Sequence, residues 1–143
     1  MTRQEYREMY NVVGAAMEVY NTLGRGMAEA IYQEALDVEM RNRGMVPERE
    51  KVLNLTYKGV VLDKTYKADF LYKGIIIELK AVDEINSDHR AQLFNYMRIT
   101  GLQRGILINY GEKFLRSERY LYIPELDDFV LLNHDNYKDY IFD

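Results

Sequence analysis

A carboxylate and a lysine stand two positions apart at the end of an apolar run, Ile75 to Val82 (IIIELKAV). Side chains alternate along a strand, so Glu78 and Lys80 would share one face with Ile76. Both faces of the run are apolar, which is typical of a strand covered on both sides. Because an isolated buried charge is costly, Glu78 needs an ion-pair partner or a metal ion. Lys80 alone would be enough, and an isolated E-x-K triplet is more often a structural salt bridge.

A second carboxylate, Asp69, lies on the preceding predicted strand and makes a metal site more plausible than a structural salt bridge alone. If the two strands form a hairpin around Lys73-Gly74, Asp69 lies about five residues from the turn and Glu78 about four, so they are near neighbours across the ladder. Two such carboxylates repel each other unless a cation lies between them. Their oxygen atoms suit Mg²⁺ or Mn²⁺. A metal-bound water is a stronger nucleophile, and Lys80 could orient it and stabilise developing phosphate charge.

Two helical patterns could add to this group. Gly26, Glu29 and Tyr32 recur every three residues and would share a helix face, from which Glu29 could supply a third carboxylate. The alternative for Glu29 is an exposed first-turn residue favoured by the helix dipole. On a later helix, Gln92 and Tyr96 are four residues apart. Gln92 could contact a phosphate or a bound water, or it could simply face solvent.

Two helices are expected before the strands that carry these residues. The first should bear an apolar stripe at steps of three and four, made of Tyr6, Tyr10, Val13, Met17 and Tyr20. Residues 21–26 break this pattern. The second helix should run from about Met27 to Arg43, with Gly44 as its C-cap. Its apolar side should consist of Met27, Ile31, Ala35 and Val38.

Three strands should follow, covering about residues 52–57, 60–72 and 75–82, the second with a bend near Asp63-Lys64. The triplet Tyr-Lys-Gly closes each of the first two and predicts two hairpin turns. The second strand should present Asp69 on one face and, on the other, the apolar residues Tyr66, Ala68, Phe70 and Tyr72.

A helix capped by Asn86-Ser87-Asp88 and ending before Gly101 should come next, followed by a fourth strand over residues 104–110. This crossover allows the third and fourth strands to pair in parallel. Residues 113–123 could form one more strand, and the remaining tail shows no clear pattern.

The set Asp69, Glu78-Leu79-Lys80 and Gln92-x-x-x-Tyr96 resembles the motif of the PD-(D/E)XK nuclease superfamily, in the branch with a QxxxY helix. More narrowly, Gly26-x-x-Glu29-x-x-Tyr32 is similar to the signature of the GxxExxY family within that superfamily. The resemblance covers roughly residues 12–110. It departs at Ala68, where the superfamily name has Pro, and this branch commonly shares that difference.

This resemblance implies an α/β fold with a restriction-endonuclease-like core, in which elements in the order αβββαβ form a mixed sheet flanked by helices, here with an extra N-terminal helix. It also implies Mg²⁺ (or Mn²⁺) held by Glu29, Asp69 and Glu78, with the carbonyl of Leu79 as a further ligand. Lys80 would be the catalytic lysine beside Asp69 and Glu78, and the accessory catalytic-site residues would be Gln92 and Tyr96.

Composition limits the other classes of protein. The chain has 143 residues, 48% of them apolar, which suits one domain with a substantial core. It has no cysteine, so disulfides, thiolate zinc sites and cysteine nucleophiles are excluded. No apolar run is long enough to span a bilayer, and the first ten residues lack the apolar region of a signal peptide. A cytoplasmic protein without a membrane partner is therefore expected.

Charge is unevenly distributed along the chain. The net charge is -4, and residues 121–143 hold six acidic side chains and one basic one, whereas residues 1–120 are close to balance. We expect one nuclease-like domain over residues 1–143, with residues 121–143 an acidic C-terminal extension. That extension could pack on the sheet, mediate a homodimer or mimic nucleic acid. Broad nonspecific DNA affinity is not indicated by such a charge.

Three functions fit these features. The leading hypothesis is a metal-dependent nuclease whose partner is nucleic acid, with DNA preferred over RNA. The alternative is a catalytically silent module of the same fold that binds nucleic acid or a protein. In the third, the polar residues form only a structural ion-pair network.

Overall fold

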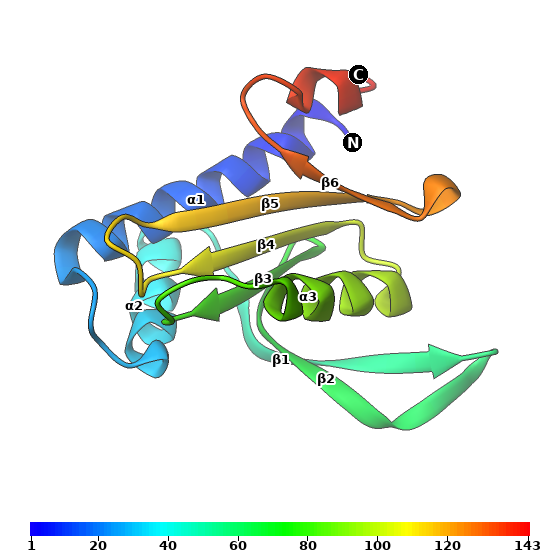
Figure 1. The fold of residues 1–143 in the computed structure, drawn as a ribbon, viewed down its shortest axis with the longest axis horizontal. Helices are drawn as coiled ribbons and strands as arrows, with labels where there is room; N and C mark the ends of the chain where they lie inside the picture. Colours follow the sequence, from blue (N-terminus) through cyan, green and yellow to red (C-terminus); the bar gives the residue numbers. More distant parts are fainter.

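The computed structural model describes residues 1–143, in which a central sheet is covered by helices on both faces (Figure 1). Helices α1 and α2 lie on one face and α3 lies on the other. The helices span Arg3–Leu23 (α1), Glu29–Asn42 (α2) and Ser87–Thr100 (α3). The strands span Glu48–Tyr57 (β1), Val60–Tyr72 (β2), Ile75–Lys80 (β3), Arg104–Asn109 (β4), Arg116–Ile123 (β5) and Asp128–Leu132 (β6). Short 3₁₀ helices span Pro124–Leu126 (η1) and Tyr137–Tyr140 (η2).

The six strands lie side by side in chain order, β1 to β6. All neighbours pair antiparallel except β3 and β4, which are parallel because α3 carries the chain back across the sheet. This arrangement confirms the predicted α/β fold, with an αβββαβ core that begins at α2 and an extra helix, α1, before it. Residues 113–123 do contain a strand, β5, and β6 adds one more at the edge.

Strand β3 is buried on both faces, as its composition predicted. Ile75, Ile77 and Leu79 pack in the cluster beneath α1 and α2, while Ile76 packs in the cluster beneath α3. None of these four side chains is accessible to solvent. Burial of apolar area on both sides anchors the strand, so the groups at its C-terminal end are carried by a rigid element.

Both predicted hairpin turns are present. Lys58 and Gly59 have φ of +48° and +79°, and Lys73 and Gly74 have the same two values. Two consecutive positive φ angles are typical of the tight type I′ turn, whose second position favours glycine. The predicted bend of β2 is also present. The pairing of the two strands shifts register between Asn54 and Thr56 of β1, which lie opposite the predicted bend.

The predicted apolar stripes of α1 and α2 are only partly correct, because Tyr6, Val13, Tyr20 and Ala35 pack against the core and the other members are exposed. In α1 the stripe leaves Tyr10 63% and Met17 43% exposed, and the buried residues are Glu8, Met9, Val12, Ala15, Ala16 and Val19. Of the stripe predicted for the second helix, Ile31 and Val38 are exposed in α2 and Met27 is exposed just before it, and the buried residues of α2 are Tyr32, Gln33, Leu36 and Met40. Each helix has apolar residues around more than half its circumference, so periodicity alone does not select the buried side.

The predicted face of β2 is also wrong in one half. Phe70 and Tyr72 pack beneath α1 and α2, whereas Tyr66 and Ala68 pack beneath α3, so the strand changes face at Asp69. Opposite this point, Glu50 of β1 has φ of +51°, a left-handed conformation that is uncommon for residues other than glycine. A local break in the β1–β2 ladder therefore lies beside Asp69.

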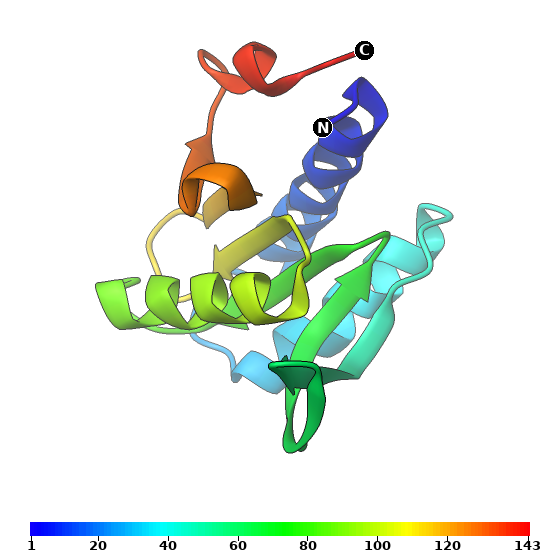
Figure 2. The ribbon, with the colours of Figure 1, turned by 90° about the vertical axis from the view of Figure 1, so that its right-hand side faces the viewer.

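The C-terminal residues pack against the rest of the fold. Strand β6 pairs with β5, and Tyr137 of η2 stacks on Tyr6 of α1 with ring centroids 4.2 Å apart. The N-terminal ammonium of Met1 donates to the carbonyl of Tyr140 at 3.0 Å, so the two chain ends lie side by side (Figure 2). No helix of the structure is long and apolar enough to cross a membrane.

A buried ion pair should make Arg104 important for stability. Its Nη1 donates to Glu8 Oε1 at 2.9 Å and to the Glu5 carbonyl at 2.8 Å, and its Nη2 donates to the Lys73 carbonyl. Arg104→Met leaves the buried Glu8 carboxylate without this partner, so we expect a loss of about 3 kcal/mol in the free energy of unfolding by urea.

The exposed pair of Arg98 with Asp127, 3.0 Å apart, provides the control. Arg98→Met should change stability little, because solvent screens an exposed ion pair. Equal effects of the two substitutions would contradict the structural role given to Arg104.

Candidate active site

Asp69 lies where β2 and β3 separate. The paired residues of this ladder end at Phe70 and Ile77, one position before Asp69 and Glu78 would meet. There the Oδ2 atom of Asp69 accepts a hydrogen bond from the backbone N–H of Leu79 at 2.8 Å. The carboxylate therefore replaces a ladder hydrogen bond and lies beside Glu78, as the hairpin register predicted.

Gln33 of α2 holds the other oxygen of Asp69. Its Nε2 donates to Asp69 Oδ1 at 2.9 Å, and its Oε1 accepts from Arg49 Nε at 3.0 Å. The Gln33 side chain is buried, and these two bonds fix its orientation. The sequence analysis missed Gln33, although it stands four residues after Glu29 and so shares its helix face.

Tyr66 and Tyr96 contact the Glu78 side of the site. The Tyr66 hydroxyl donates to Glu78 Oε1. The rings of Tyr66 and Tyr96 stack with centroids 3.5 Å apart and planes 8° from parallel. Tyr96 thus reaches the site through Tyr66, a residue that the sequence analysis placed in the core and gave no role.

The carboxyl groups of Glu29, Asp69 and Glu78 all have raised pKa values. Burial is the largest cause in each case. The charge of Asp69 also raises the pKa of Glu29. Burial, with a smaller contribution from the charge of Glu29, raises the pKa of Glu78 to about 7. These mutual effects show that the three groups lie within electrostatic reach of one another.

Lys80 is the one cation whose charge lowers the pKa of all three carboxyl groups. Its side chain is half-buried, and it forms no salt bridge with any of them. A structural Glu78–Lys80 bridge, one of the readings of the sequence, is therefore absent. The site holds three carboxyl groups and one ammonium group, so another cation would improve its charge balance.

The motif with Gly26 and Tyr32 has a different geometry from the predicted helix face. Helix α2 begins at Glu29, so Gly26 precedes it in a loop with φ of +105°, a conformation suited to glycine. The Tyr32 hydroxyl donates to the Gly24 carbonyl at 2.6 Å and accepts from the Met27 N–H at 3.2 Å. Tyr32 therefore fixes the loop that leads to Glu29.

The predicted residue Gln92 does not contact the carboxylates. It is exposed and lines a groove of about 530 Å³ between α3 and β1, together with Leu55, Asp88, His89, Ala91, Asn95, Tyr96 and Ile99. His89 completes the cap of α3, because its Nδ1 accepts from the Asn86 N–H at 3.2 Å. Through Tyr96, this groove borders the Tyr66–Glu78 contact.

The end of β4 clamps the chain just after Lys80. The buried Asn109 side chain accepts from the Val82 N–H at 3.0 Å and donates to the Val82 carbonyl at 2.8 Å. The Tyr110 N–H donates to the Lys80 carbonyl at 2.8 Å. Gly111 lies so close to Val82 that a Cβ atom there would collide with its backbone. These contacts fix the direction in which the chain leaves β3.

Tyr110 extends this clamp to the other side of the site. Its ring stacks on Tyr32 with centroids 4.3 Å apart, and both rings are fully buried. The segment Asn109-Tyr110-Gly111 therefore positions the loop after Lys80 and, through Tyr32, the loop before Glu29. Asn109 and Tyr110 were predicted only as the end of a strand, and Gly111 was given no role.

The donor chemistry of the site suits a divalent cation. Asp69 and Glu78 provide hard oxygen atoms, and the raised pKa values show that their negative charges are poorly compensated. No group of three or more acidic or histidine side chains lies close enough in the structure to hold a metal ion. Mg²⁺ commonly uses only one or two carboxylates and keeps several waters, so Asp69 and Glu78 fit such an ion.

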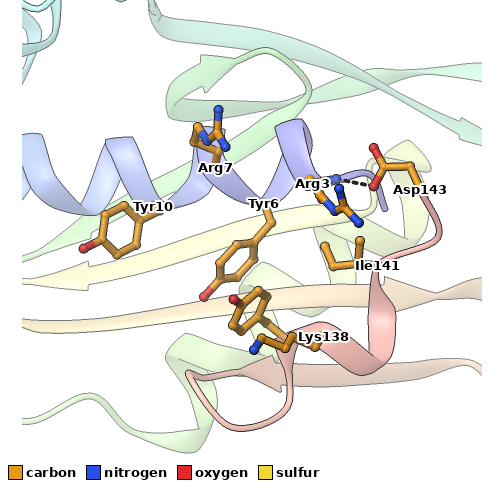
Figure 3. A pocket seen from close by; sticks show the side chains of 8 residues that line it. Arg3, Tyr6, Arg7, Tyr10, Lys138, Ile141 and Asp143 are labelled. Atoms are coloured by element: carbon orange, nitrogen blue, oxygen red, sulfur yellow. Dashed lines mark hydrogen bonds between the residues drawn. The ribbon is translucent and has the colours of Figure 1, made fainter.

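A larger hollow, of about 550 Å³, lies apart from these residues between α1 and the C-terminal segment (Figure 3). It is lined by Arg3, Tyr6, Arg7, Tyr10, Tyr137, Lys138, Ile141 and Asp143. None of the predicted site residues lines it, so its size does not make it the active site.

Comparison with known proteins identifies a family for most of the chain. A family model described as the PD-(D/E)XK nuclease superfamily matches residues 6–134, most of the chain. The crystal structure of SSO0001 is similar with a TM-score of 0.49 and 19% sequence identity, over 63% of this chain and 48% of that one. The chain therefore spans about half the length of that protein. No curated protein matches the chain.

The raised pKa of Glu78 predicts how stability depends on pH when no divalent ion is present. The folded-state pKa of about 7 lies above the unfolded value near 4.5, so the folded protein binds the proton more tightly between these values. The free energy of unfolding should fall as pH rises from about 4.5 to 7. Glu78→Gln should lessen this fall and be more stable than the wild type at pH 8, as measured by urea unfolding in EDTA.

The two proteins should converge in stability near pH 4, where Glu78 is protonated in both the folded and unfolded wild type. Glu34→Gln, at an exposed position of α2, should follow the wild-type pH profile. A wild type that remains more stable than Glu78→Gln at pH 8 in EDTA would contradict the raised pKa.

The clamp at Val82 predicts a strong effect of Asn109→Ala. This change leaves the Val82 N–H and carbonyl without their side-chain partner, so we expect a loss of about 2–3 kcal/mol in the free energy of unfolding. Asn136→Ala removes side-chain hydrogen bonds at an exposed turn and should cost less. Urea titrations of both variants provide the measurement, and equal losses would argue against the clamp.

Proposed function

This chain belongs to the PD-(D/E)XK nuclease superfamily, whose members usually use divalent metal ions. From this membership we propose that the protein is a metal-dependent phosphodiester hydrolase that acts on DNA. One observation carries the proposal. Three carboxyl groups with raised pKa values lie within electrostatic reach of one another and of a single lysine, at the point where two strands separate.

Asp69 and Glu78 would hold Mg²⁺ or Mn²⁺, with the Leu79 carbonyl as a further ligand. Glu29 is not close enough to share an ion with both carboxylates in the structure, so it would act through a metal-bound water. A divalent ion bound there would supply an activated water and neutralise charge on the phosphate. The side chains of Gln33 and Tyr66 each donate to one carboxylate oxygen, which leaves other lone pairs free and fixes the directions in which they point. Both supporting residues are themselves buried, so the carboxylates are held by rigid neighbours.

Lys80 would orient the attacking water and stabilise the charge that develops on the phosphate. Its lack of a salt bridge in the structure leaves all three of its N–H donors free for this role. Near pH 7 without a cation, Glu78 holds a proton about half of the time. A nearby divalent charge would lower its pKa and favour the carboxylate.

We also propose that the chain belongs to the GxxExxY family within the superfamily. The spacing of Gly26, Glu29 and Tyr32 supports this assignment. The contacts of Tyr32 with Gly24 and Met27 give the motif a physical purpose, since they fix the loop that presents Glu29. Gln92 and Tyr96 would be accessory residues, with Gln92 facing the substrate from the groove beside α3.

A cleavage assay with matched variants tests this function. Purified protein is incubated with single-stranded, duplex and branched DNA and with RNA, in Mg²⁺ or Mn²⁺. Asp69→Asn, Glu78→Gln and Lys80→Ala should each lower the rate by roughly 100-fold or more, because each removes a group placed at the reacting phosphate. Glu34→Gln removes an exposed carboxylate of α2 and should retain the wild-type rate.

Metal binding, measured by calorimetry with Mn²⁺, separates the roles of these residues. Asp69→Asn should bind Mn²⁺ much more weakly, whereas Lys80→Ala should bind it as well as or better than the wild type. Cleavage that survives all three substitutions would rule out this site. Binding of Mn²⁺ and DNA without cleavage of any substrate would instead support the catalytically silent module.

A further inference from the structure

The outer part of the β1–β2 hairpin extends away from the body of the protein. We call residues 51–67 the β1–β2 arm; it is the teal-to-green hairpin at the lower right of Figure 1. Its inner residues Leu53 and Leu55 pack against the cluster beneath α3, but residues 56–61 and 63–65 are all exposed. They include Tyr57, Val60 and Val61, each at least 60% exposed. A two-stranded ribbon is only marginally stable alone, and exposed apolar side chains often mark a binding surface. The projecting hairpin is therefore a candidate site for binding a partner.

The arm is basic, although the protein is acidic. It contains four of the chain's eight lysines, Lys51, Lys58, Lys64 and Lys67, and only one acidic residue, Asp63, so its net charge is +3. Lys51 pairs with Glu48 at 2.9 Å, which leaves the three lysines toward the tip, Lys58, Lys64 and Lys67, without a salt bridge. The other residues of the chain contain 15 basic and 22 acidic side chains, a net charge of -7. The positive charge is therefore concentrated on one exposed element, which points to a polyanionic partner.

The turn geometry fixes where these charges lie. Lys58 and Gly59 form the tight turn between the paired residues Tyr57 and Val60, so the arm ends in a lysine. Lys67 pairs with Val52, which is six residues before Lys58 on β1, so at about 3.3 Å per residue Lys58 and Lys67 lie roughly 20 Å apart along the arm. That length corresponds to roughly six steps of a nucleic acid backbone at about 3.4 Å per base pair.

The arm is joined directly to the candidate active site. Strand β2 runs from Lys64 and Lys67 into Asp69, and Tyr66 between them donates to Glu78. The groove beside α3 has Leu55 of the arm on one side and Gln92 on the other. A backbone lying along the arm would thus be led toward Glu78.

We propose that the β1–β2 arm is the surface by which this protein holds duplex nucleic acid beside its active site; this rests on the proposed function. The exposed lysines contact backbone phosphates, and a two-stranded ribbon is one of the elements that a major groove admits. Tyr57, Val60 and Val61 provide apolar contact at the same tip. The acidic body of the protein keeps the duplex from binding elsewhere, because like charges repel.

A second copy of the chain fits the arm less well. A symmetric dimer brings the same patch of both copies together, so lysines of one arm would meet lysines of the other. The arm carries one acidic residue against four lysines, which is too few to compensate that repulsion. A duplex instead supplies negative charge along the whole length of the arm.

Salt-dependent binding of a fluorescein-labelled 30-base-pair DNA duplex in EDTA tests the proposal. Lys58→Gln/Lys64→Gln should weaken binding about tenfold at 100 mM salt. It should also reduce the slope of log K against log salt by about 1.8, because two phosphate contacts are lost. Lys113→Gln/Lys138→Gln removes the same charge from exposed lysines outside the arm and should leave binding near the wild-type value.

Asp69→Asn separates this proposal from the proposed function. It should abolish cleavage in Mg²⁺ while binding the duplex as tightly as the wild type in EDTA. If the wild type binds duplex through the arm but no substrate is cleaved, the arm stands and the nuclease activity fails.

Three results would overturn the role of the arm. The two double variants could weaken binding equally, or the wild type could fail to bind the duplex at any salt concentration tested. Alternatively, light scattering could show a wild-type dimer that Tyr57→Ser/Val61→Ser converts to a monomer without affecting DNA binding. The last result would assign the arm to an interface between copies of the chain.

Discussion

The physical constraint on which the site depends is the crowding of carboxyl groups at the point where β2 leaves β3. Asp69 takes up the N–H of Leu79, and this bond holds it beside Glu78. Burial raises the pKa of both groups and of Glu29, nearby carboxylates add to each shift (Glu50 in the case of Asp69), and Lys80 is the cation whose charge lowers all three. In the absence of another cation this arrangement lowers the stability of the fold. A group of residues that lowers stability is better explained by a function than by a role in packing.

The elements around the site are rigid, and this rigidity keeps the carboxyl groups in place despite the loss of stability. Strand β3 is covered on both faces, so the strand that carries Glu78 and Lys80 has little freedom to move. Asn109 and Gly111 fix the chain after it, and Tyr32 stacked on Tyr110 fixes the loop before Glu29. The end of β4 therefore serves as a common support for both sides of the candidate site.

Sequence patterns predicted the strands of this protein better than the faces of its helices. A run such as IIIELK has a clear period, and the two Lys-Gly turns need a positive φ that glycine allows, so β2 and β3 were identified closely. Helix α1 has both tyrosines and small aliphatic residues at helical spacing, and periodicity cannot tell which set is buried. Tertiary packing buried the side with Met9, Val12 and Ala15, and left Tyr10 exposed.

The order of the elements, the double burial of β3 and the proximity of Asp69 to Glu78 could all be predicted, because they follow from local period and hairpin length. The support that Gln33, Tyr66 and Asn109 give to the site was decided by tertiary packing. These residues come from different elements that meet only after the chain has folded. The change of face at Asp69 and the outward course of the β1–β2 arm were decided in the same way. Both depend on how strands twist and separate in space, and no local pattern of side chains records that.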